Sequence, residues 1–122
     1  MEPDVRIARI YDDPGAGDGY RVLIDRLWPR GVAKERARLD EWARALAPSA
    51  ELRRWFGHDP ARFDDFRERY RAELAARGEE LDALRRRARD GTVTLLYGAR
   101  DREHNDAVVL AELLREGDGG GG

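Results

Sequence analysis

The sequence predicts a small α/β domain with a central, mostly parallel sheet of about three strands flanked by helices. The segment 92–97 is apolar and rich in β-branched residues and carries no charge, which is typical of a central buried strand. A short loop separates it from residues 103–115, an apolar helix pattern, so the two form a β-loop-α unit. Helical periodicity also fills most of the chain between residue 33 and residue 90.

Two further strands precede the helices. Residues 5–11 alternate well enough for a strand, and the loop 12–19 is rich in glycine and aspartate without the Gly-Lys-Ser/Thr ending of a P-loop. Residues 20–28 form the second predicted strand, in which Asp25 and Arg26 interrupt an apolar run. Pro29 ends it because proline has no N–H to donate.

The central part of the chain predicts several helices. Apolar residues at helical spacing indicate a first helix over residues 33–47. Ser49 is placed to cap a short second helix that ends at Gly57. Asp59 and the proline after it then open a long helical stretch over 61–90, in which we expect a kink or a break at Gly78.

Composition limits the classes of protein. The 122 residues fit one domain, expected over residues 1–116, with a disordered glycine-rich tail over 117–122. No apolar stretch approaches the ~20 residues of a membrane span, and the N-terminus does not resemble a signal peptide. The chain has no cysteine, which excludes disulfides and thiolate catalysis. We therefore expect a cytoplasmic protein that does not contact membranes.

The charge pattern disfavours a protein dedicated to nucleic acid. The net charge is −2 and the pI is near 5.8, whereas nucleic-acid-binding domains usually carry a basic excess. In residues 61–90, arginines and acidic residues alternate, which is typical of ion pairs on an exposed helix face.

The first group of candidate site residues follows the second strand. Ligands of open α/β sheets bind at the carboxyl ends of the strands, and charges buried there require a partner. Arg26 and Arg30 are candidates for holding a phosphate or carboxylate, with Asp25 orienting one of them, and Trp28 is a candidate for stacking on a planar ligand. The alternative is an Asp–Arg pair that ties the strand end to a helix. Side chains 25 and 26 of a strand point to opposite faces, so only Arg26 is expected to share a pocket with Trp28.

The second group lies around the two histidines. His58 and His104 occur where loops meet helices and are the candidate general acids or bases, although capping or surface roles are the alternative. Tyr97 ends the third strand, and Asp101 and Asn105 follow it as candidate ligand-binding residues near a helix N-terminus, which favours anions. If the strands are parallel, this group faces the first group across one cavity.

The sequence does not support serine catalysis or metal binding. Ser49, the only serine, is explained by capping, and no nucleophile elbow is present. No compact set of metal ligands occurs, so we expect neither a metal nor a cofactor.

The motifs RVLIDRLWPRG, APSAELRRWFGHDP and VTLLYGARDREHNDAVVL closely resemble the YeaO-like family of small bacterial proteins, a domain of unknown function. The resemblance covers residues 5–115 and implies a small cytoplasmic α/β protein. More distant relatives carry Cys-His-Arg where this chain has Asn105, Asp106 and Ala107, so thiol chemistry is not carried over. The signature positions are Arg26, Trp28, Pro29, Arg30, Gly31, Trp55, Phe56, Gly57, His58, Tyr97, Asp101, His104 and Asn105.

Three functional interpretations follow. The first is a protein that binds an anionic or nucleotide-like small molecule, with or without catalysis on it. The second is a nucleic-acid-binding or DNA-processing accessory domain. The third is a non-catalytic interaction domain whose charges only solvate its surface. The convergence of the two groups of candidate residues favours the first, and the sequence leaves open whether the protein is an enzyme.

Overall fold

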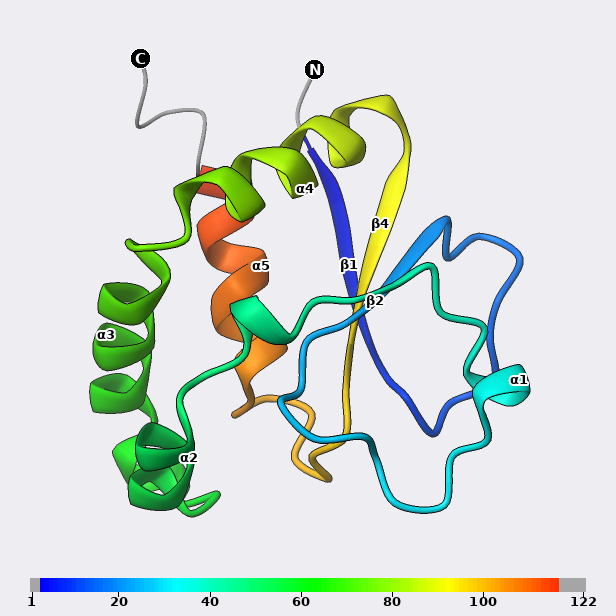
Figure 1. Ribbon diagram of the computed structural model, residues 1–122. Coiled ribbons are helices and arrows are strands. Elements are labelled where there is room, and N and C mark those ends of the chain that lie inside the picture. The colour runs from blue at the N-terminus through cyan, green and yellow to red at the C-terminus, as the bar shows by residue number, and fades with distance from the viewer. Residues whose placement is uncertain (1–2, 117–122) are drawn as a thin grey trace.

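The computed structural model describes residues 3–116 and confirms the α/β class (Figure 1). The sheet has four parallel strands in the order β1-β4-β2-β3, one more than the sequence indicated. Leu95 in the middle of β4 lies opposite Ile7 of β1 and Val22 of β2. The predicted disorder of residues 117–122 lies outside the described residues. The strands are β1 (Asp4–Arg9), β2 (Tyr20–Leu23), β3 (Glu41–Trp42) and β4 (Thr92–Tyr97).

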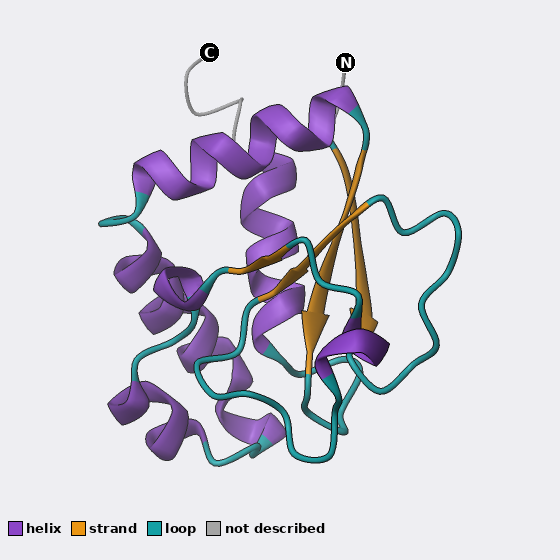
Figure 2. Cartoon of the chain, turned by 45° about the vertical axis from the view of Figure 1, so that its right-hand side comes forward, coloured by secondary structure: helices purple, strands orange, loops and turns teal. Residues whose placement is uncertain are grey.

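Four helices gather on one side of the sheet, whereas loops and the short α1 lie on the other side (Figure 2). Helix α5 packs along β1 and β4, and α3 and α4 contact α5 in turn. The α-helices are α1 (Lys34–Ala37), α2 (Ala50–Phe56), α3 (Phe63–Leu74), α4 (Gly78–Asp90) and α5 (Asp106–Glu116), and the 3₁₀ turns are η1 (Arg44–Leu46) and η2 (Pro60–Arg62).

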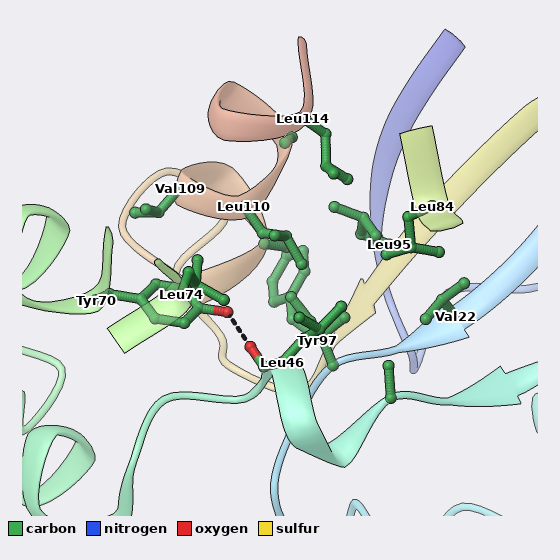
Figure 3. Packing of buried hydrophobic residues seen from close by; sticks show 14 of the residues in the cluster. Val22, Leu46, Tyr70, Leu74, Leu84, Leu95, Tyr97, Val109, Leu110 and Leu114 are labelled. Carbon is green, nitrogen blue, oxygen red and sulfur yellow. Dashed lines mark hydrogen bonds between the residues drawn. The ribbon is translucent and has the colours of Figure 1, made fainter. Parts of the chain in front are cut away.

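Each face of the sheet has its own apolar cluster, because successive strand residues point to opposite faces. Leu95 and Tyr97 belong to the larger cluster, on the helix side (Figure 3). Leu96 belongs to the smaller cluster, under the loops and α1. Within the larger cluster the Tyr70 hydroxyl is buried and donates a 2.6 Å hydrogen bond to the carbonyl oxygen of Leu46.

The predicted helix over residues 33–47 is wrong. Helix α1 ends after four residues, because Arg38 adopts a left-handed conformation with φ of 48°. Tertiary hydrogen bonds then draw the chain onto the sheet: the backbone N–H of Arg21 donates to the Asp40 carboxylate at 2.8 Å, and the N–H of Asp40 donates to the carbonyl of Arg21. The apolar residues taken as one helix face instead cover both faces of the sheet, as with Trp42 and Leu46.

The helix caps and the helix break predicted elsewhere in the chain are confirmed. The Ser49 hydroxyl accepts the backbone N–H of Leu52 at 3.1 Å and caps α2, and Gly57 ends α2 with φ of 54°. Asp59 caps the turn that leads into α3 by accepting the N–H of Ala61 at 3.0 Å. The expected break occurs between α3 and α4, and α4 begins at Gly78.

Candidate functional site

A cavity of about 340 Å³ lies beyond the carboxyl ends of β2 and β4. Five parts of the chain form its wall: residues 25–29 after β2, Pro48 with helix α2 and the turn that follows it, Phe66 of α3, residues 98–99 after β4, and residues 104–106 at the start of α5. This is the edge at which ligands of open parallel sheets bind. The volume falls near the lower end of the ~300–1,000 Å³ typical of small-molecule sites.

Besides Asp25, which was expected to orient an arginine, five of the eight predicted catalytic and ligand-binding residues line this cavity: Arg26, Trp28, His58, His104 and Asn105. They come from segments up to 79 positions apart in the sequence, and the parallel sheet brings them together.

The other three predicted residues lie elsewhere. The Arg30 side chain is exposed, and its carbonyl oxygen accepts a 2.9 Å hydrogen bond from the Tyr11 hydroxyl. Tyr97 is 2% exposed and belongs to the core on the helix side of the sheet. Asp101 acts from outside the cavity wall, through its contact with His104.

The segment after β2 differs from the prediction. Strand β2 ends at Leu23, so Asp25 and Arg26 do not follow strand alternation, and both line the cavity. The Asp25 carboxylate accepts the backbone N–H of Gly98 at 2.8 Å and thereby ties the chain after β2 to the chain after β4. A side chain at position 98 would bring its Cβ within 2.9 Å of the same carboxylate oxygen, which explains the glycine.

Asp106, the first residue of α5, interacts with Asp25, and both side chains line the cavity. Burial, and then the neighbouring charge of Asp25, raise the pKa of Asp106 well above its ordinary value. Burial also raises the pKa of Asp25, against the opposing effects of the hydrogen bonds from Asp106 and Gly98 and the charge of Arg53. We name Asp25 and Asp106 the carboxyl pair.

Three arginines stand around the cavity. Arg53 and Arg54 project from α2, both exposed, and Arg26 is partly buried, with its Nε donating to the Pro48 carbonyl at 3.4 Å. The cap of α2 is itself anchored, because the Ser49 hydroxyl donates to the Glu73 carboxylate at 2.6 Å. The three guanidinium groups outnumber the two carboxyl groups of the pair. The cavity is therefore electropositive.

His58 stands at the exposed side of the cavity in a strained conformation. It follows Gly57 with φ of 57°, a left-handed value that is uncommon for residues other than glycine and is concentrated at functional sites. Its ring lies 6.2 Å from that of Phe56, measured between centroids.

Asp101 orients His104. The His104 Nδ1 lies 2.9 Å from the Asp101 carboxylate, and the imidazole packs edge-on against Phe63 at 5.1 Å between centroids. The backbone N–H of Glu103 and then the His104 ring, both hydrogen-bonded to this carboxylate, lower the pKa of Asp101. With Nδ1 donating to Asp101, the neutral ring leaves its Nε2 as a hydrogen-bond acceptor.

Asn105 and Trp28 have structural contacts in addition to their place in the cavity wall. Asn105 is 2% exposed; its Oδ1 accepts the N–H of Val108 at 3.0 Å and its Nδ2 donates to the Asp101 carbonyl at 2.9 Å. It therefore caps α5. Trp28 donates its Nε1–H to the Val32 carbonyl at 2.7 Å and meets the Trp42 ring edge-on at 5.3 Å.

Sequence reasoning missed Arg53, Arg54 and Asp106. The adjacent arginines precede the Trp-Phe-Gly-His turn, and this proximity to His58 was an available signal. Asp106 gave no signal, because an acidic residue in the first turn of a helix is ordinarily explained by the helix dipole.

Two classes of feature are absent from the described part of the chain. Over residues 3–116, no group of three or more His, Asp or Glu side chains is arranged to hold a metal ion. Within the same residues, no helix has the length and apolar character needed to cross a membrane.

Comparisons with known proteins identify relatives over nearly the whole chain. The chain is 44% identical over 112 residues to "Uncharacterized protein YeaO" of Escherichia coli (strain K12). The aligned residues cover 92% of this chain and 97% of the relative. It is 43% identical over 113 residues to "Uncharacterized protein Rv3073c" of Mycobacterium tuberculosis (strain ATCC 25618 / H37Rv) and to "Uncharacterized protein Mb3100c" of Mycobacterium bovis (strain ATCC BAA-935 / AF2122/97), with 93% of this chain and 95% of each relative covered.

No solved structure matches the chain. A family model described as "Inactive DUF488-N3 subclade" matches residues 4–117. The resemblance predicted from the sequence motifs is confirmed, and the chain belongs to the YeaO-like family of DUF488 proteins.

Proposed function

We propose that the protein binds an anionic, nucleotide-like small molecule in the cavity at the carboxyl ends of β2 and β4, without covalent catalysis. The observation that carries this proposal is the convergence of Arg26, Arg53 and Arg54 on a cavity whose wall contains only two carboxyl groups, those of Asp25 and Asp106. An anion supplies the missing counter-charge, and guanidinium groups suit phosphate and carboxylate oxygens because they donate two parallel hydrogen bonds.

The volume of the cavity and the net charge of the chain favour a small-molecule ligand over nucleic acid. A cavity of about 340 Å³ suits one small molecule. A polymer requires instead a basic stripe along the surface, whereas this chain has a net charge of −2. The ligand would then be a cytoplasmic metabolite, as the family resemblance implies.

Binding is better supported than catalysis. The chain has no cysteine, and the hydroxyl of its single serine is engaged with Leu52 and Glu73. The description of the matching family as inactive is in keeping with a site that has kept its cavity and uses it for recognition. His104, held by Asp101, would then serve as a hydrogen-bonding group for the ligand.

The test is calorimetric titration with inorganic phosphate and ribose 5-phosphate, in parallel for the wild type and for Arg53→Gln and Arg54→Gln. Arg53 and Arg54 are exposed, and an exposed ion pair contributes about 0.2–1 kcal/mol, so each substitution should weaken binding by up to about fivefold. Arg86→Gln is the matched control, because Arg86 is exposed on α4 and is not part of the cavity wall.

Equal affinity in all four proteins would show that the anion binds outside this cavity. Absence of binding by either anion at millimolar concentration would refute the proposal and favour an interaction domain.

A further inference from the structure

Charged groups of both signs line the cavity without pairing with each other. The guanidinium groups belong to Arg26, Arg53 and Arg54, and the carboxyl groups belong to Asp25 and Asp106. In the described part of the chain, none of these five side chains forms an ion pair with N···O of 4.0 Å or less. Charges that are removed from water require a partner. A ligand with charges of both signs therefore complements this wall.

The positive and negative groups lie on different parts of the wall. Arg53 and Arg54 project from α2 and are exposed. Asp25 and Asp106 are partly buried: the Asp25 carboxylate accepts the Gly98 N–H after β4, and Asp106 is the first residue of α5. A ligand that contacts both parts has its anionic group at the arginines and a cationic group at the carboxyl pair.

His104 adds a hydrogen-bond acceptor whose direction is fixed by Asp101. The Asp101 Oδ1 accepts the backbone N–H of Glu103 at 2.8 Å and that of His104 at 3.0 Å, and its Oδ2 lies 2.9 Å from the His104 Nδ1. A carboxylate only accepts, so in the neutral ring Nδ1 carries the proton and Nε2 is an acceptor. Asp101 lies outside the cavity wall and His104 lies in it, so the ring presents its Nε2 edge to the cavity. Nε2 has no hydrogen-bond partner among the described residues.

A primary ammonium group matches these acceptors. It has three N–H donors and no acceptor, whereas a hydroxyl group has a single proton to donate and a second anionic group is repelled by the carboxyl pair. A positive charge also opposes the burial and the like charge of Asp25 that raise the pKa of Asp106.

We infer that the ligand is a phosphate monoester that carries a primary amine, with its phosphate at the arginines of α2 and its ammonium at the carboxyl pair and the His104 Nε2. Asp101 is then a positioning residue, because it acts through the tautomer of His104. This inference rests on the proposed function, because it takes the arginines to hold the anionic group. A carboxyl pair that served only to attach α5 to the chain after β2 would contribute to stability and not to the choice of ligand.

Calorimetric titration compares aminoethyl and aminopropyl phosphate with ethyl and propyl phosphate, which have the same phosphate and chain without the amine. In the wild type, at least one amino ester should bind about tenfold more tightly than its alkyl partner, as expected for a hydrogen bond between charged, partly buried groups. In Asp106→Asn, which keeps the shape of the side chain, this advantage should fall to about threefold or less. Glu103→Gln is the matched control: it removes an exposed charge nearby that is not part of the wall, and it should keep the advantage.

Asp101→Asn provides an independent measurement. The two backbone N–H groups hold the amide oxygen of the new side chain, so its NH₂ donates to the His104 Nδ1 and the ring proton moves to Nε2. A donor then faces the ammonium, and the advantage of the amino esters should fall, whereas alkyl phosphates should bind at least as tightly as they do to the wild type because the lost charge is negative. Nitrogen chemical shifts at about pH 8.5, at which imidazoles are ordinarily neutral, identify the tautomer. The chain has two histidines, and His58→Asn assigns their signals.

The outcomes separate the two proposals. If amino and alkyl esters bind the wild type equally at both chain lengths, or if the advantage survives unchanged in Asp106→Asn, the inference is overturned and the anion-binding proposal stands without it. An advantage that survives in Asp101→Asn, or a wild-type spectrum with the proton on Nε2, overturns the role given to Asp101 and His104. If neither class of ester binds, both proposals are refuted.

Discussion

Replacement of Gly19 by alanine tests the packing that positions the start of β2 against β4. Gly19 has φ of 63°, and a Cβ added there would lie 2.2 Å from the backbone carbonyl oxygen of Thr92. The left-handed conformation alone costs an alanine about 1–2 kcal/mol. Relief of the clash requires a shift of the β4 backbone, which adds about 1–3 kcal/mol, as overpacking usually does. The free energy of unfolding should therefore fall by about 2–5 kcal/mol, out of the ~5–15 kcal/mol typical of a domain.

Gly57→Ala is the matched control for this prediction. Gly57 has φ of 54°, but a Cβ there would lie 3.6 Å from its nearest neighbour, the carbonyl oxygen of Arg54, at ordinary van der Waals distance. Only the conformational cost of about 1–2 kcal/mol applies to it. Urea denaturation followed by circular dichroism measures both variants, and Gly19→Ala should also lower the Tm by on the order of 10 °C. If the two variants lose the same stability within about 0.5 kcal/mol, the close contact with Thr92 does not contribute, and the reasoning fails.

Three further predictions concern the core, the carboxyl pair and α2. Tyr70→Phe leaves the buried Leu46 carbonyl without its donor and should lower the free energy of unfolding by about 1–3 kcal/mol in urea denaturation; a change near zero would mean that this carbonyl finds another partner. Burial, and then the charge of Asp25, raise the pKa of Asp106 above its ordinary 3.8. Protonated Asp106 therefore makes its full contribution to stability below pH 3.8, and this contribution is lost as the pH rises through the raised pKa. Asp106→Asn should therefore gain stability relative to the wild type as the pH rises from 4 to 8, and a pH-independent difference would contradict the raised pKa. Ser49→Ala should destabilise the protein by about 0.5–2 kcal/mol and weaken phosphate binding in calorimetry, because the helix it caps presents two arginines to the cavity; unchanged binding would show that these arginines are positioned by other contacts.

Elements whose signals are local could be predicted from the sequence. Strand β4 follows from an uncharged β-branched run, and the boundaries of α2 follow from Ser49 and Gly57. The predicted helix over 33–47 fails because long-range contacts decide its conformation. The hydrogen bonds between Asp40 and Arg21 place this segment on the sheet edge, and helical periodicity alone cannot reveal them.

Some features of the candidate site could likewise be predicted from the sequence, whereas others depend on long-range contacts. That Arg26 and His104 meet at one cavity followed from a general property of parallel sheets, namely that the carboxyl ends of their strands share an edge. Tyr97 was expected to emerge at that edge, but its side chain points into the core, because which face a residue occupies depends on the register of its strand. The raised pKa of Asp106 comes from burial and from Asp25, which is distant in the sequence, and no local pattern reports a pair of this kind.

The central position of β4 also affects how the chain is synthesised and folded. In the described residues, β1 pairs with β4 alone, and β4 separates it from β2. While the ribosome is still adding residues before position 92, the first strand has no neighbour to hydrogen-bond with and presents an open edge. Native assembly of the sheet must wait until β4 emerges and inserts between two strands made much earlier. The arrival of β4 therefore sets the moment at which the amino-terminal part of the nascent chain can fold.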